Sequence, residues 1–227
     1  MEISPDHIVY WSRGPVTLNA TLLFTWVVMG ILTLGSWLVT RRLTAAVEIP
    51  PWQNLLEAVV SGMARQLTEV SKKRPERIFP FVGTLFLYIA ATNLLSVVPG
   101  FRPPTGSLST AVALASCVFL AVPAYGISQV GLVPYLMNYL RPTPIMLPFN
   151  IMGELSRTIA LAVRLFGNVM SGAMICGILL IIAPLVFPVF MQLLGLLTGM
   201  VQAYIFAILA TIYIAAGMEA GERKKTP

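Results

Sequence analysis

Long apolar runs separated by short polar segments organise the chain. Five of these runs are long enough to cross a bilayer and are predicted to be membrane helices. They cover residues 16–40, 78–98, 108–130, 150–183 and 189–220. The last two would each reach about 45–50 Å at 1.5 Å per residue, well beyond the roughly 30 Å of hydrocarbon in a bilayer. We therefore expect an all-α membrane protein, a single domain over residues 1–227, with a long, strongly tilted C-terminal helical hairpin that bends at Pro184 and Pro188.

Two segments between the runs carry patterns of their own. Over residues 50–71, apolar residues recur at helical spacing, while Glu57, Arg65 and Glu69 fall largely on the opposite side. This predicts an amphipathic helix on the cytoplasmic side, which can lie on the membrane, on a partner or on the protein's own helices. Residues 131–150 contain four prolines and are expected to form a loop at the membrane edge.

The composition is that of an integral membrane protein. Hydrophobic residues make up 57% of the 227 residues and charged residues only 11%, whereas about a quarter of a soluble domain is charged. The net charge of +6 is shared by many nucleic-acid-binding proteins, but here the basic residues flank apolar runs and set the membrane orientation. The sequence carries no metal-ligand spacing, phosphate-binding glycine loop or catalytic triad. We expect no cofactor, no metal, no nucleic acid and no catalysis by this chain alone.

Basic residues gather on one side of the predicted topology. If the segment 41–77, the loop 131–150 and the C-terminal tail share a side with the helix end that carries Arg157, that side holds twelve of the fifteen Lys and Arg residues. The opposite side holds only Arg13 and Arg102. The positive-inside rule makes the richer side cytoplasmic. The N-terminus is then outside and the C-terminus inside, which an odd number of spans such as five satisfies.

One basic residue lies within an apolar run. Arg164 is the only charged residue between Thr158 and Ala183, and a central arginine costs about 2.5–3.5 kcal/mol on insertion scales. None of the nine acidic residues lies deep in a predicted span, so its counter-charge is expected on another chain or in a water-filled cavity. The plainer interpretation is an arginine that anchors a tilted helix near the cytoplasmic interface, because Arg157 is only two turns away.

Small and polar residues accompany Arg164 on both arms of the predicted hairpin. Asn168 and Ser171 follow at i+4 and i+7 and share its helix face. On the other arm, Gln202 lies on a similar strip of small and polar residues, and on a straight hairpin it would lie within two turns of the depth of Arg164. We interpret Arg164, Asn168, Ser171 and Gln202 as ion-translocation residues. The alternative for Gln202 is a hydrogen bond between helices with no role in transport.

The residues from Arg164 to Asn168 (RLFGN), with Glu154 to Arg157 (ELSR) before them, resemble the signature of F-type ATP synthase subunit a. Two further segments, 93–101 (NLLSVVPGF) and 201–206 (VQAYIF), match other motifs of that family, and the resemblance covers about residues 76 to 220. It implies a stator subunit of the membrane F0 sector in the inner (plasma) membrane of a bacterium. The partners implied are the c-subunit ring, the peripheral-stalk b subunits, the remaining synthase subunits and membrane lipid.

The resemblance also implies a mechanism. Two aqueous half-channels, one open to each side, would reach the middle of the membrane without meeting, and an ion would ride between them on a carboxylate of the rotating ring. Arg164 matches the essential arginine of the family, which separates the half-channels, and Asn168 and Gln202 would line the polar path. Rotation of the ring would be coupled to ATP synthesis or hydrolysis elsewhere in the complex.

The sequence departs from the family pattern at positions that concern the ion. The family commonly has an acidic residue or histidine where this chain has Ala173 and Gly195, and often an acidic residue near Gly106 and Ser107. H⁺ is the expected ion, and Na⁺, carried in a divergent branch of the family, is the alternative. A stand-alone secondary transporter, which would normally show repeated halves, and a purely structural assembly subunit are the remaining alternatives.

Overall fold

The computed structural model describes residues 9–13, 16–41, 51–70, 75–98, 100–139, 145–182 and 187–222. A two-stranded antiparallel hairpin, β1 (Val9–Arg13) and β2 (Val16–Asn19), comes first, and the regular elements that follow it in the described ranges are all helices. The helices are α1 (Ala20–Thr40), α2 (Pro51–Val70), α3 (Pro75–Leu95), η2 (Pro104–Gly106, a 3-10 turn), α4 (Leu108–Val130), α5 (Leu132–Tyr139), α6 (Met146–Ile182) and α7 (Phe187–Glu222). The expected all-α membrane fold is confirmed.

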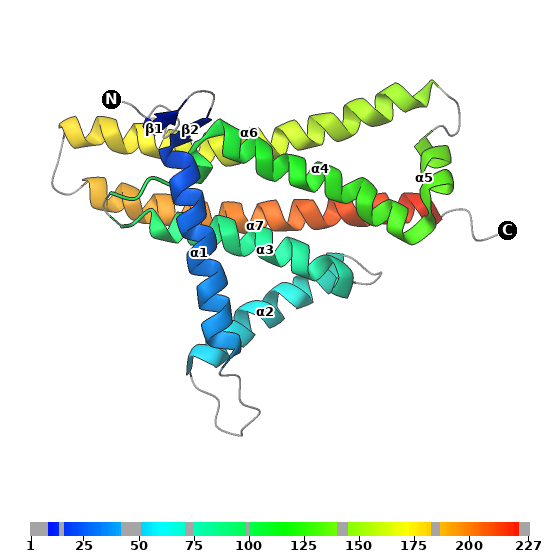
Figure 1. Cartoon of the computed structure of the whole chain (residues 1–227), viewed down its shortest axis with the longest axis horizontal. Helices are drawn as coiled ribbons and strands as arrows, with labels where there is room; N and C mark the ends of the chain where they lie inside the picture. The colour runs from blue at the N-terminus through cyan, green and yellow to red at the C-terminus, as the bar shows by residue number, and fades with distance from the viewer. Residues whose placement is uncertain are drawn as a thin grey trace.

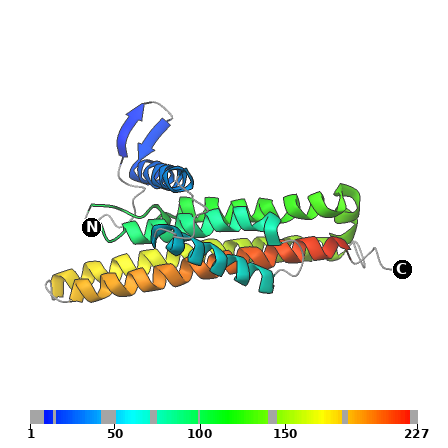
Figure 2. The same ribbon diagram turned by 90° about the horizontal axis from the view of Figure 1, so that it is seen from below.

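Five of the described helices are long and apolar enough to cross a membrane: α1, α3, α4, α6 and α7. In Figure 1, α3, α4, α6 and α7 run along the long axis of the molecule, while α1 crosses that direction steeply. Figure 2 shows α1 and the strand hairpin standing to one side of this long bundle. With 21 residues, α1 is about 32 Å long and fits an upright crossing. The 37 residues of α6 give a length of about 56 Å, which exceeds the thickness of the bilayer. Because α6 also crosses the direction of α1, it must tilt strongly away from the membrane normal.

Two segments differ from the sequence-based expectation. Residues 16–19 form strand β2, so the first membrane helix begins at Ala20 rather than at residue 16. The β-branched Val16 and Thr17 suit a strand, and they pair with Arg13 and Ser12 across the hairpin. Within the stretch 131–150, where the sequence predicts a loop, Leu132–Tyr139 form helix α5 and α6 begins at Met146.

Local backbone chemistry explains why helix replaces loop there. Gly131 adopts a φ of 91°, a left-handed conformation that ends α4 and turns the chain into α5. Pro148 lies in the first turn of α6, where a missing N–H leaves no bond unmade, so it does not prevent the helix from starting at Met146. Pro188 likewise falls in the first turn of α7, whereas Pro184, the other expected bend residue, lies outside the described residues.

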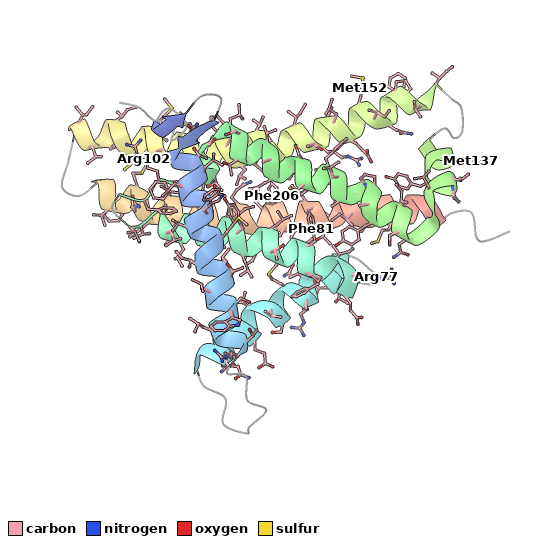
Figure 3. The ribbon with its side chains drawn as sticks, viewed as in Figure 1. Arg77, Phe81, Arg102, Met137, Met152 and Phe206 are labelled. Atoms are coloured by element: carbon pink, nitrogen blue, oxygen red, sulfur yellow. The ribbon has the colours of Figure 1, made fainter. Side chains whose placement is uncertain are left out.

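The core lies between α3, α4, α6 and α7. Phe206 of α7 is fully buried and lies in the middle of the bundle, with Phe81 of α3 nearby in Figure 3. Eight of the twenty buried core positions that the structure describes are alanine, and these include Ala111, Ala115, Ala203, Ala207 and Ala210. Small side chains let the helix backbones approach closely, which is how helices associate where water supplies no driving force.

Helix α2 packs on the protein's own membrane helices through its C-terminal half. Leu67 is buried in the main core, and the Tyr204 hydroxyl of α7 donates a hydrogen bond to the Oε1 atom of Gln66. The charged residues Glu57, Arg65 and Glu69 are exposed. Among the three interpretations of the amphipathic pattern, packing on the same chain therefore holds for the C-terminal half of α2.

Helices α4 and α7 are in close contact at Gly217. A Cβ atom added there would lie 2.8 Å from Val122 Cγ1 and 3.3 Å from the Val122 carbonyl oxygen. Such distances are shorter than van der Waals contact, so the two helices depend on glycine at this point.

We predict that Gly217→Ala destabilises the chain by about 1–3 kcal/mol, the usual effect of overpacking a core. The measurement is the thermal transition of the purified complex, together with the amount of this chain retained in it. Gly30→Ala in α1 is the matched control, because a Cβ there meets nothing within 4 Å and alanine favours the helix. Equal transitions for the two variants would contradict the close packing described here.

Candidate functional site

Arg164 projects from the outward face of α6. Its neighbours Leu161 and Leu165 are buried in the core, whereas Arg164 itself is exposed in the isolated chain. Asn168 is half-buried and Ser171 is exposed along the same face, and Arg157 lies two turns before Arg164 in the same line. We call Arg157, Arg164, Asn168 and Ser171 the arginine stripe.

Arg164 has no hydrogen bond or ion pair within the part of the chain that the structure describes. Two other arginines differ from it: the guanidinium of Arg157 lies 5.6 Å from the ring centre of Tyr213, and that of Arg41 lies 4.7 Å from the ring centre of Trp37. Exposed Ala160, one turn before Arg164, and exposed Val163 lie next to it on the helix. A permanent positive charge therefore stands on an apolar surface with no counter-charge from the described residues.

The stacking of Arg157 on Tyr213 sets the register between α6 and α7. The two helices are antiparallel neighbours, and both rise 1.5 Å per residue. Asn168 comes eleven residues after Arg157, and Gln202 comes eleven residues before Tyr213. Asn168 and Gln202 therefore lie at about the same depth along the hairpin, to within the reach of the Arg157 side chain.

Gln202 is buried inside the bundle, and its Nε2 atom has no hydrogen-bond partner among the described residues. The Oγ1 atom of Thr105 in η2 is in the same condition. Thr105 adjoins Gly106, where an added Cβ would lie 3.2 Å from Val169 Cγ1 on α6, so η2 reaches the level of Asn168. Buried polar atoms without a protein partner are expected to bind water or an ion. The Gln202 and Thr105 atoms lie on the bundle side of α6, opposite the surface that carries the arginine stripe.

Sequence reasoning missed the polar residues around η2. Thr105 and Ser107 are fully buried, and the Ser107 and Ser109 hydroxyls lie 2.5 Å apart. Hydroxyl residues beside a proline-rich turn are ordinary loop residues, so only their concentration next to a predicted span was a signal. The turn folds back against α6 instead of projecting from the bundle, and that contact cannot be deduced from local pattern.

A second polar region lies at the other end of the stripe. A cavity of about 340 Å³ opens between α4, α5, α6 and α7. Its polar lining comes from Tyr135, Asn150, Glu154, Arg157, Thr158 and Tyr213. Because Arg157 belongs to both the cavity and the stripe, the cavity comes within two turns of Arg164 on α6.

Neither Ala173 nor Gly195 is covered by the rest of the chain; both are exposed. Neither side chain can bind or release a proton. Within the described ranges, no group of three or more His, Cys, Asp or Glu residues could hold a metal ion. The chemistry available along this surface therefore consists of one uncompensated guanidinium, amides and hydroxyls.

Comparison with known proteins gives the family. A family model described as "ATP synthase A chain" matches residues 22–215. The chain is 60% identical over 219 residues to "ATP synthase subunit a 2" of Acaryochloris marina, covering 96% of this chain and 94% of that protein. It is 60% identical over 223 residues to "ATP synthase subunit a 1" of Chlorobaculum parvum, with 98% and 99% covered, and 56% identical over 227 residues to "ATP synthase subunit a" of Albidiferax ferrireducens, with 100% and 98% covered. The chain therefore belongs to the ATP synthase subunit a family, a component of the membrane sector of rotary ATP synthases.

Proposed function

We propose that this chain supplies two ion half-channels, and the arginine that separates them, at the interface with a rotating ring of c subunits. Ion movement past Arg164 would turn the ring and so couple transport to ATP synthesis or hydrolysis elsewhere in the complex; the chain itself would catalyse nothing. The observation that carries the proposal is Arg164, a guanidinium on the apolar surface of α6 with no counter-charge among the described residues. Such a charge is expensive to keep in a membrane unless a partner compensates it.

The proposed role of Arg164 follows from its chemistry. A guanidinium remains charged at any working pH, so it competes with the transported cation for a carboxylate that comes to face it. The carboxylate must release its ion as it approaches Arg164 and can take up another as it leaves. The same charge repels a cation that would pass directly along α6, which keeps the two half-channels apart.

We propose the cavity between α4, α5, α6 and α7 as the inner half-channel. The positive-inside rule favours a cytoplasmic location for this end, because Arg157 is close to it and the basic C-terminal tail follows α7. Arg77, at the start of α3, and Arg102, after its end, lie toward opposite ends of the long axis in Figure 3. That separation agrees with a cytoplasmic Arg77 and an outer Arg102.

We propose that the outer half-channel passes through the polar interior around η2 and Gln202, and reaches the stripe at Asn168. The unpartnered Nε2 of Gln202 and Oγ1 of Thr105 support this. With Ala173 and Gly195 in place of titratable residues, water, hydroxyls and amides would conduct the ion. H⁺ remains the preferred ion on the family resemblance, and Na⁺ is the second candidate, because neutral oxygen atoms are also suitable ligands for a hard cation.

Arg164→Ala is expected to abolish ATP-driven ion pumping in membrane vesicles while the complex still assembles, because the side chain makes no contact that holds the fold. Pumping is followed with a pH- or Na⁺-sensitive dye, and assembly by the yield of intact complex. Arg65→Ala on the exposed face of α2 is the control. Normal coupled pumping by Arg164→Ala would contradict the mechanism and would favour a plain anchoring arginine.

Gln202→Leu and Asn168→Leu are each expected to slow pumping several-fold without stopping it, because water can partly replace an amide in a hydrated path. Initial pumping rates at equal complex content are the measurement. Gln129→Leu on α4 serves as control, since the one hydrogen bond of its amide among the described residues is to Met218 Sδ. Parent-like rates in both test variants would assign Gln202 and Asn168 to packing alone.

The ion is tested by ATP hydrolysis of the whole complex at alkaline pH with and without Na⁺. H⁺ as the carried ion predicts no Na⁺ stimulation and no protection of the ring carboxylate from a carbodiimide by Na⁺. It also predicts that Ala173→Glu with Gly195→His raises proton flux, because titratable groups then relay the proton. Strong Na⁺ stimulation together with Na⁺ protection would reverse the assignment in favour of Na⁺.

A further inference from the structure

We propose that Asn93 is a positioning residue that holds Gln202 at the depth of Asn168, an inference that rests on the role proposed for Gln202. Asn93 lies in the last turn of α3 and is buried. Its Nδ2 atom donates a hydrogen bond to the carbonyl oxygen of Gly199 on α7 at 2.8 Å. Gly199 is three residues before Gln202, which places the tie within one helical turn of the amide it would position.

Glycine is required on α7 for this tie. A Cβ atom at position 199 would lie 2.8 Å from Asn93 Cγ and 3.0 Å from Asn93 Nδ2. Both distances are too short for any side chain, so the amide of Asn93 occupies the space that a Cβ would take. The fit of amide against glycine fixes how α7 is rotated at this point as well as its depth.

A second tie lies two turns further toward the start of α7. Gln192 Nε2 donates to the carbonyl oxygen of Ser96 at 2.8 Å, and Ser96 Oγ donates to the carbonyl oxygen of Asn93 at 2.6 Å. The two ties attach α7 to the end of α3 at points about 10 Å apart along α7. Two separate attachments restrict both sliding and rotation of a helix, whereas one attachment leaves a pivot.

The arginine stripe of α6 contacts α7 through the stacking of Arg157 on Tyr213, eleven residues after Gln202. Nearer to Gln202 it makes no hydrogen bond to α7 within the described ranges: Ser171 Oγ donates to the Asn168 carbonyl of its own helix at 3.2 Å, and Arg164 has no bonded partner there. The hydrogen bonds that hold α7 close to Gln202 therefore come from α3, a helix outside the hairpin. A slip of α7 by one residue would move Gln202 by about 1.5 Å along the helix axis. It would also rotate the side chain by about 100° about that axis, so that it pointed in another direction.

The test compares Asn93→Ala, the double variant Asn93→Ala with Gly199→Ala, and Thr92→Ala, all in the assembled complex. In the double variant the methyl group at position 199 enters the space that Asn93 vacates, so packing is refilled while the hydrogen bond stays lost. Thr92 is the matched control: it is also buried on the same helix, but within the described ranges its Oγ1 bonds the Tyr88 carbonyl of α3 and nothing on α7. Assembly and pumping are measured for all three variants.

The position of residue 202 is read separately, as the rate at which a small thiol reagent modifies Gln202→Cys. This is done with Cys117 and Cys176 replaced by alanine, in the parent and in each variant. We expect Asn93→Ala and the double variant to change both the pumping rate and the modification rate by about fivefold, the factor that one net hydrogen bond is worth. Thr92→Ala should leave both near the parent value.

Three outcomes would overturn the proposal. Recovery of pumping in the double variant would leave packing volume as the only role of Asn93, and an unchanged modification rate would show that residue 202 does not move. Failure of both Asn93 variants to assemble would assign the hydrogen bond to folding. These outcomes are separate from the fate of the proposed function. Normal pumping by Arg164→Ala removes the half-channel mechanism whatever Asn93 does, whereas loss of pumping there with parent-like Asn93 variants removes only the positioning role.

Discussion

The organisation of this protein depends on one electrostatic constraint: the positive charge of Arg164 is not neutralised by any residue that the structure describes. Arg164 stands on an apolar helix face with no ion pair or hydrogen bond in the described ranges. In a bilayer such a charge needs water, a headgroup or a foreign carboxylate. The polar regions of the structure are placed accordingly: the cavity that contains Arg157 lies on one side of Arg164 along α6, and the buried amide of Gln202 and hydroxyl of Thr105 lie on the other.

Rigid packing behind the stripe makes that charge useful. Glycine contacts at Gly199 and Gly217 bring α7 against α3 and α4, and the core around Phe206 leaves α6 little freedom on its inner side. The outer side of α6 keeps exposed apolar residues beside Arg164. In the proposed function, this close packing keeps Arg164 fixed while the ring moves past it. A guanidinium that moved along with a ring carboxylate could not displace the ion from that carboxylate.

Much of this architecture could be predicted from sequence, for definite reasons. Run length reports helix length directly, so the long hairpin followed from it, and helical spacing placed Arg164, Asn168 and Ser171 on one face. The helical content of residues 131–150 could not be predicted, because it depends on the conformation of Gly131 and on prolines tolerated in a first helical turn. The burial of Thr105 depends on η2 folding against α6, and the level match of Asn168 with Gln202 depends on the stacking of Arg157 on Tyr213. Contacts between distant segments of this kind have no local signature.

We propose that a carboxylate on a partner subunit neutralises Arg164. The most direct measurement is a cryo-electron-microscopy structure of the assembled complex that resolves this side chain. We expect the ring to cover the arginine stripe and the Arg164 guanidinium to lie within about 4–6 Å of the path of the ring carboxylates, the range over which an opposite charge acts strongly. A guanidinium that reaches lipid headgroups, or that pairs with Glu154 of its own chain, would contradict it.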